Sequence, residues 1–396
     1  MAVFPLLVGA TLQAVATKML IAALFAAAFN LLAGQAGLLS FGHAAYFGFG
    51  AIVTLHFMAL SEKGTFSIPT PIMPLVGLLS TLAFATIAGS LVTKRSGTYF
   101  SLVTLAIAEL IHVIAPLWDD VFGGEAGLTA MRMPWHSIAF ASTREVYYLV
   151  AIWVAIAVAA LWALSKTAYG QLVRALRNNE VRVEALGYNA HLIKTVAFGM
   201  SGAFAGLAGA LLALSNETAN YSLFSASISI EIVFFCFIGG TTLFFAPISA
   251  AALLTAFPFL VSNYTRAWPL YEGMIFMAVM LYAPNGVGVW LANVIRKWGA
   301  GGSEGGPFRS MRPAGAILPI VGLIVLIETI SRGHASGSQS FLTASISSYV
   351  PLQAPNLPAG LVLGAFLIVA GSLLVHLIGR REALPPDLAS QPGGAN

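Results

Sequence analysis

The chain has 396 residues, of which 58% are hydrophobic and only 9% are charged. A soluble domain usually carries about 25% charged residues, so this composition excludes a soluble fold and indicates a protein surrounded by lipid. The net charge of +4 is too small to indicate nucleic-acid binding. Cys236 is the only cysteine, which excludes an intramolecular disulfide and a paired-cysteine metal site.

Apolar runs of the length that a helix needs to cross a bilayer, about 20 residues, recur along the chain. The first run has no basic residue before Lys18 and no polar cleavage region, so we expect no signal peptide. The pattern predicts an all-α polytopic membrane protein with about nine core helices, some broken or half-spanning, and two C-terminal ones. The predicted spans are 8–33, 44–60, 73–93, 97–118, 146–165, 193–215, 227–241, 246–263, 268–284, 313–331 and 358–378.

The segment from Gly34 to Ala51 interrupts this apolar pattern with five glycines and several polar residues. Glycine density of this kind favours turns, breaks and close helix packing over a plain helix. Polar groups between spans are costly unless protein or water satisfies them, so Gln35, Ser40 and His43 are candidates for a solute pathway. The glycines could instead serve packing or gating. We see no second ligand at a suitable spacing from His43, so a metal role is disfavoured.

Basic residues orient the chain, because cytoplasmic loops of membrane proteins are rich in Lys and Arg. The loop between the fifth and sixth spans is therefore predicted to be cytoplasmic, with the N-terminus outside and the C-terminus inside. Arg332 is a misfit, since this count places it outside. The basic residues of that loop are Lys166, Arg174, Arg177, Arg182 and Lys194.

The sequence predicts four regions. Residues 1–297 form the membrane core, and the Gly-rich stretch 298–312 is a flexible cytoplasmic linker. Residues 313–380 hold two additional transmembrane helices, and the polar tail 381–396 is expected to be disordered and cytoplasmic.

The cytoplasmic loop from Lys166 to Asn189 has the spacing of short amphipathic helices, and Gly187 fits a helix C-cap. Such helices could dock into a groove of a soluble partner or lie on lipid headgroups. The residues alone leave both alternatives open.

Acidic residues lie inside several predicted spans. Glu109, one turn from His112, and Glu231 could line a pathway or serve as structural hydrogen-bonding groups. A helix-packing face is predicted at Gly202, Gly206 and Gly209, which recur at helical spacing. A broken-helix motif is predicted at Gly239, Gly240 and Pro247.

Several of these stretches together resemble the permease subunits of branched-chain amino-acid ABC importers, the LivH/LivM-type family. The resemblance covers roughly 15–295 and is closer to LivM, on the segment Arg95–Glu109. The other matching stretches are Gly34–Ala51, Arg174–Gly187, Ser201–Ala210, and Ser229–Glu231 with Ile238–Thr241 and Ala246-Pro247. The chain departs from the family in three places: the family's extra N-terminal helix is missing or shortened, Ala246 stands before Pro247, and the region after 298 has no counterpart.

The resemblance implies that residues 1–297 are an importer permease core in a bacterial inner membrane. It implies no enzyme activity and no cofactor of the chain's own, with ATP bound and hydrolysed by two cytoplasmic ATPase partners. The implied further partners are a second permease subunit, making a heterodimer, and a periplasmic binding protein. The implied ATPase-coupling residues are Arg174, Arg177, Asn178, Asn179, Glu180, Glu184, Ala185 and Gly187.

The substrate implied is a branched-chain, hydrophobic amino acid, although similar permeases carry urea or short amides. The chain contains no Gly-x-x-x-x-Gly-Lys-Ser/Thr run, so ATP hydrolysis in trans is expected. An ion-coupled secondary transporter is the alternative class, and it has no need for an ATPase-docking loop. A membrane-embedded enzyme has little support, because no metal-ligand or nucleophile cluster stands out.

Overall fold

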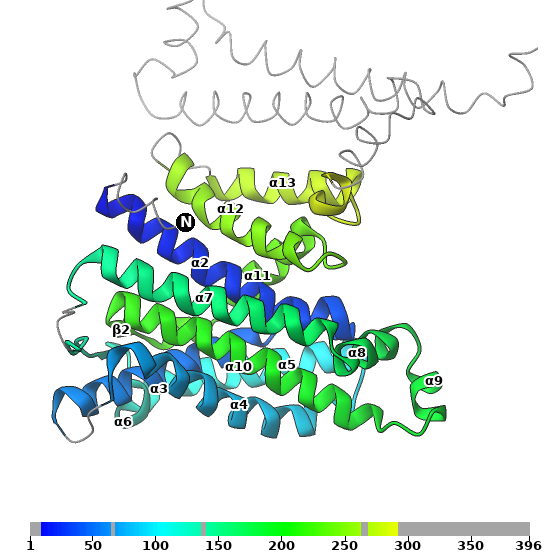
Figure 1. Ribbon diagram of the computed structural model, residues 1–396, viewed down its shortest axis with the longest axis horizontal. Coiled ribbons are helices and arrows are strands. Elements are labelled where there is room, and N and C mark those ends of the chain that lie inside the picture. The colour runs from blue at the N-terminus through cyan, green and yellow to red at the C-terminus, as the bar shows by residue number, and fades with distance from the viewer. Residues whose placement is uncertain (1–8, 65–67, 136–139, 263–267, 292–396) are drawn as a thin grey trace, which may run out of the picture. The chain divides into compact units, whose positions relative to one another are not determined.

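A computed structural model describes residues 9–64, 68–135, 140–262 and 268–291. These residues fold almost entirely into helices (Figure 1). In chain order the elements are α2 (Ala10–Asn30), η1 (Leu31–Ala36), α3 (His43–Glu62), η2 (Thr70–Ile72), α4 (Met73–Val92), α5 (Thr98–Ile114), η3 (Ala115–Leu117), α6 (Asp119–Phe122), β1 (Leu128–Thr129), α7 (Thr143–Lys166), α8 (Ala168–Asn178), α9 (Glu180–Ala185), α10 (Ala190–Asn216), β2 (Thr218–Ala219), η4 (Tyr221–Phe224), α11 (Ala226–Gly239), α12 (Phe245–Val261) and α13 (Trp268–Tyr282).

The predicted all-α membrane architecture is confirmed. Each predicted span between 8 and 284 coincides with a helix, and six of the described helices are long and apolar enough to cross a bilayer. Helices α11 and α12 have 14 and 17 residues, fewer than the about 20 that a full span needs. The linker 298–312, the added spans within 313–380 and the tail 381–396 lie outside the described residues, so those domain boundaries stay predictions.

The chain divides into two compact units. The first comprises residues up to Phe259 together with Asn285–Trp290, and the second includes α13. Within the first unit α10 is the central helix, packed against α2, α3 and α4 (Figure 1). Helices α8 and α9 lie at one end of this unit and β2 lies at the other (Figure 1).

Close approach to α10 depends on glycine. A Cβ atom added to Gly209 would lie 1.8 Å from the carbonyl oxygen of Phe47 on α3. A Cβ at Gly206 would lie 2.2 Å from the hydroxyl of Thr81 on α4, and one at Gly202 would lie 2.4 Å from the Cβ of Ala85. The three glycines therefore occupy the surfaces where α3 and α4 contact α10, in the manner of small-residue membrane interfaces.

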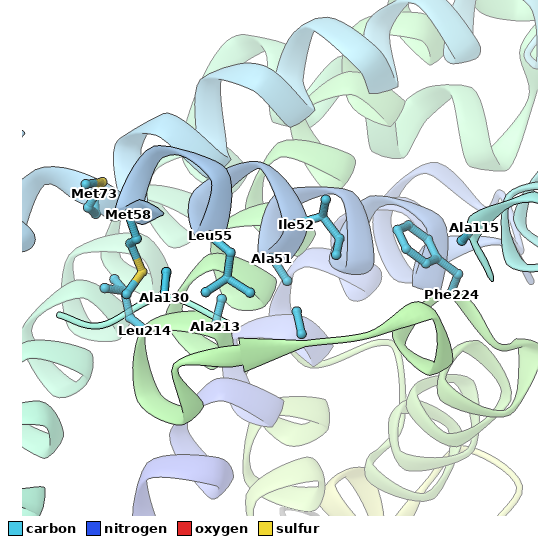
Figure 2. Packing of buried hydrophobic residues seen from close by; sticks show 11 residues of the cluster. Ala51, Ile52, Leu55, Met58, Met73, Ala115, Ala130, Ala213, Leu214 and Phe224 are labelled. Atoms are coloured by element: carbon cyan, nitrogen blue, oxygen red, sulfur yellow. The ribbon is translucent and has the colours of Figure 1, made fainter. Parts of the chain in front are cut away.

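The end of the unit near β2 is held by apolar packing and one ion pair. Figure 2 shows Leu55 and Met58 of α3 directed toward Ala213 and Leu214 of α10. The strands β1 and β2 pair antiparallel beside this cluster. Nearby, Arg132 pairs with Glu217 at 3.3 Å, and its Nη1 donates 2.6 Å to the Leu214 carbonyl oxygen.

Candidate coupling junction and solute pathway

The loop between α7 and α10 folds as the two short helices that its spacing predicts. Thr167 caps α8 by accepting from the Gly170 amide at 3.2 Å, and Asn179 caps α9 by accepting from the Arg182 amide at 3.0 Å. Such side-chain caps satisfy backbone donors that a helix N-terminus leaves free. Gly187 follows α9 with a φ of +87°, the left-handed backbone expected after a helix end. This prediction from the sequence is confirmed.

Helices α8 and α9 are tied to the base of α10 by polar contacts. The Tyr169 hydroxyl donates 2.8 Å to the Ile193 carbonyl oxygen, and burial raises the pKa of this hydroxyl. Lys194, almost fully buried on α10, pairs with Glu180 at the start of α9. Movement of α9 would therefore move α10.

The outer surface of this loop exposes apolar side chains. Val181 is 74% exposed, Leu186 is 70% exposed and Tyr188 is 48% exposed. Val173 and Leu176 of α8 and Val183 of α9 are buried on the opposite side. Glu184 and Ala185 are exposed beside the apolar group. An amphipathic helix pair with apolar residues left on its outer side offers a surface for a partner.

The inner side of α8 contacts the glycine-rich segment. Arg177 donates from Nη1 to the carbonyl oxygen of Gly34, inside the π-helical turn η1. A Cβ at Gly37, which has a φ of +72°, would lie 2.8 Å from the Cγ of Arg177. Glycine at position 37 therefore allows the arginine side chain to lie directly on the backbone at the end of η1.

The α11–α12 turn also reaches this junction. A Cβ at Gly34 would lie 2.6 Å from the carbonyl oxygen of Thr241, and one at Gly239 would lie 2.5 Å from that of Ala246. Gly240 has a φ of +97°, which favours glycine, and Pro247 is buried in the first turn of α12. The predicted broken-helix motif is thus a tight turn that lies against η1.

These segments enclose a polar pocket of about 520 Å³, which we call the junction pocket. Asn30 Oδ1 and Gln35 Oε1 are buried there without a hydrogen-bond partner among the described residues. The pocket is also lined by Lys166, Arg174, Arg177 and Asn178. Residues of the predicted coupling loop and the candidate pathway residue Gln35 therefore meet at one place.

His43 lies elsewhere, fully buried in the helix core and outside the junction pocket. Its Nε2 is 2.8 Å from Ser201 Oγ, and that hydroxyl donates 2.6 Å to the Ala28 carbonyl oxygen. Because the serine proton is used in this bond, Nε2 of His43 must be the donor. The rings of Phe29 and Tyr46 surround the imidazole. This geometry joins α2, α3 and α10 and favours a structural role for His43 over a place in the pathway.

Ser40 and Glu109 have different surroundings. Ser40 is fully buried, and its hydroxyl accepts from the Gly42 amide at 3.3 Å in the loop before α3. Glu109 is half-buried on α5, and it does not pair with His112, whose Nδ1 donates 3.2 Å to the Tyr221 carbonyl oxygen. Neither Ser40 nor Glu109 lines one of the pockets described here.

Glu231 on α11 lines a second pocket, of about 230 Å³, together with Lys18 on α2. We call it the Lys18–Glu231 pocket. Its remaining lining is almost entirely apolar and comes from α2, α3, α10, η4, α11 and α12. Lys18 was not among the predicted site residues, although a lysine inside the first apolar run is itself a signal of function.

No three His, Cys, Asp or Glu side chains of the described residues are grouped to hold a metal ion.

Comparison with known proteins assigns the chain to a family. Residues 11–284 match the family described as branched-chain amino acid transport system / permease component. The chain is 26% identical over 308 residues to the high-affinity branched-chain amino acid transport system permease protein LivM of Salmonella typhimurium, covering 72% of this chain and 71% of that protein. It is 24% identical, with the same coverage, to LivM of Escherichia coli. No solved structure matches the chain. The chain therefore belongs to the family of permease components of branched-chain amino acid transport systems.

Proposed function

We propose that this chain forms one side of the pathway through which an ABC importer carries branched-chain amino acids across a bacterial inner membrane. The observation that carries the proposal is the contact of α8 with η1, in which Arg177 holds the Gly34 carbonyl oxygen. It connects a surface-exposed helix pair to the interior of the membrane core. A secondary transporter has no need for a contact that transmits movement from an ATPase to its core.

The proposed partners are two cytoplasmic ATPases, a second permease subunit and a periplasmic binding protein. Val181, Leu186 and Tyr188 offer the apolar surface on which one ATPase would dock. The nearby Arg182, Glu184 and Ala185 would complete the contact around it. ATP is bound and hydrolysed by these partners and not by this chain.

In this mechanism, closure of the ATPase pair displaces α8 and α9 together. Arg177 passes the displacement to η1, and the Lys194–Glu180 pair passes it to α10. The turn at Gly239 and Gly240 moves with η1, because the two backbones are in contact at Thr241. Rigid helices with few discrete arrangements can convert such a shift into alternating access.

The substrate assignment rests on the family and on the relatives, both of which are described as branched-chain amino acid transport components. We therefore favour leucine, isoleucine and valine over urea or a short amide.

Uptake by the complete complex in proteoliposomes tests the proposal. With ATP inside, the vesicles should accumulate radiolabelled leucine, isoleucine and valine, but not urea or acetamide. Val181→Asp should reduce uptake at least tenfold by weakening ATPase docking. Met131→Asp introduces an aspartate at another exposed apolar residue, near β1, and should leave uptake unchanged. Uptake that persists without ATP would contradict the proposal.

A further inference from the structure

The Lys18–Glu231 pocket carries one positive and one negative group in an otherwise apolar wall. Lys18 lies on α2, and Glu231 lies on α11. Thr255 on α12 is a further polar lining residue, but its hydroxyl already donates 2.7 Å to the Ala251 carbonyl oxygen. The two charged side chains are thus the groups available to orient a ligand.

We propose that this pocket binds the carried α-amino acid as a zwitterion, with Lys18 pairing its carboxylate and Glu231 pairing its ammonium group. The inference rests on the proposed function, because it identifies where this solute is held within the chain.

The first argument is that Lys18 and Glu231 do not neutralise each other by forming an ion pair. Lys18 and Glu231 do not pair with each other, in contrast to Arg132–Glu217 and Lys194–Glu180. A charge within a membrane segment is costly and is usually paired with another group. Two opposite charges that line one pocket and remain apart suit a ligand that carries both signs.

The second argument is the apolar wall. Phe25 and Phe47 lie with their ring centroids 4.8 Å apart, and Ile232, Phe235 and Leu212 also line the pocket. Aliphatic and aromatic walls favour a branched hydrocarbon side chain through burial of apolar surface. A volume of about 230 Å³ is below the range of drug-sized sites, about 300–1,000 Å³, and fits a small solute.

Together these features favour an amino acid over urea or a short amide as the bound solute. Urea and short amides have neither a formal charge nor a branched hydrocarbon group. Such a solute would leave both charged side chains without a partner and the apolar wall without contact. A site that offers polar groups to its ligand discriminates against a ligand that cannot pair them.

The test compares leucine with two analogues that each lack one charge. Saturation-transfer difference NMR on the complete complex in nanodiscs would give their dissociation constants. One analogue is 4-methylpentanoate, which lacks the ammonium group, and the other is isopentylamine, which lacks the carboxylate.

Lys18→Met should weaken leucine binding about tenfold to a hundredfold, since a hydrogen bond to a charged group is lost, and should leave isopentylamine binding unchanged. Glu231→Gln should weaken leucine binding similarly and leave 4-methylpentanoate binding unchanged. Lys18→Arg keeps the charge and should retain leucine binding. Lys63→Met and Glu125→Gln are matched controls on exposed residues and should bind all three ligands as the wild type does.

The outcomes separate the two proposals. If the wild-type complex imports leucine and both variants bind it normally, the pocket is not the solute site, Lys18 is an interfacial anchor, and the proposed function stands. Equal loss of all three ligands in both variants would also overturn the pairing, because it would indicate a distorted pocket. A wild-type complex that imports none of leucine, isoleucine and valine contradicts the proposed function, and the zwitterion site is refuted with it.

Discussion

The contact between Arg177 and the glycine-rich segment can be tested by adding a single methyl group. Gly37→Ala places a Cβ 2.8 Å from the Cγ of Arg177 and imposes a side chain on a residue with a φ of +72°. The left-handed conformation costs about 1 kcal/mol for a residue other than glycine. Displacing Arg177 from the Gly34 carbonyl oxygen costs about another 1 kcal/mol, a low value for a charged hydrogen bond because the arginine is partly exposed.

Gly64→Ala is the matched control for this change. Gly64 has a φ of +73°, and a Cβ there would have no atom within 4 Å. Both variants carry the backbone strain, but only Gly37→Ala disturbs the contact with Arg177 of α8. The difference of about 1 kcal/mol predicts leucine transported per ATP about fivefold lower in Gly37→Ala than in Gly64→Ala.

The assay measures leucine uptake and ATP hydrolysis in the same proteoliposomes. A double-mutant cycle with Arg177→Ala should show strongly non-additive effects, since both changes remove one contact. Equal transport per ATP in Gly37→Ala and Gly64→Ala would refute the role of this contact in coupling.

Three further changes test the packing of the core by thermal unfolding of the purified complex. Gly209→Ala should lower the unfolding temperature, since its Cβ would lie 1.8 Å from the Phe47 carbonyl oxygen and overpacking costs about 1–3 kcal/mol. Arg132→Met should lower the free energy of unfolding by about 2 kcal/mol, because Glu217 and two carbonyl oxygens lose their donor. Ser201→Ala should cost about 1–3 kcal/mol by leaving the His43 Nε2 unpaired, with transport per ATP unchanged.

Two of these substitutions have matched controls. Gly273→Ala adds a methyl group where no atom lies within 4 Å and should not lower the unfolding temperature. Arg144→Met changes an exposed arginine and should have little effect. Loss of transport in Ser201→Ala with normal stability would contradict the structural role of His43 and return it to the pathway.

The sequence was sufficient to predict the helices, because length and apolar composition decide whether a segment crosses a bilayer. It also predicted the short helices α8 and α9, since polar and apolar residues alternate there with helical spacing and Gly187 marks the end. Both predictions depend on local sequence. They need no knowledge of which helices are neighbours.

The surroundings of single polar residues could not be predicted in this way. Helices α2 and α3 are largely apolar around their circumference, so their sequences do not indicate which face meets another helix. His43 and Gln35 lie eight positions apart in one motif, yet one is enclosed by aromatic rings and the other lines the junction pocket. The deciding contacts come from Ser201 and Arg177, which are distant in the sequence.

Two helices connect the proposed solute site to the coupling junction. On α2, Lys18 lines one pocket and Asn30 lines the other, and at 1.5 Å per residue they are separated by about 18 Å along the helix. On α11, Glu231 precedes Gly239 by eight residues, or about 12 Å. A displacement that Arg177 imposes on η1 would therefore reach both charged residues through rigid helices. Since the two charges lie on different helices, any relative movement of α2 and α11 changes their separation. The bound zwitterion requires a fixed separation, so the same movement that opens the pathway would release it.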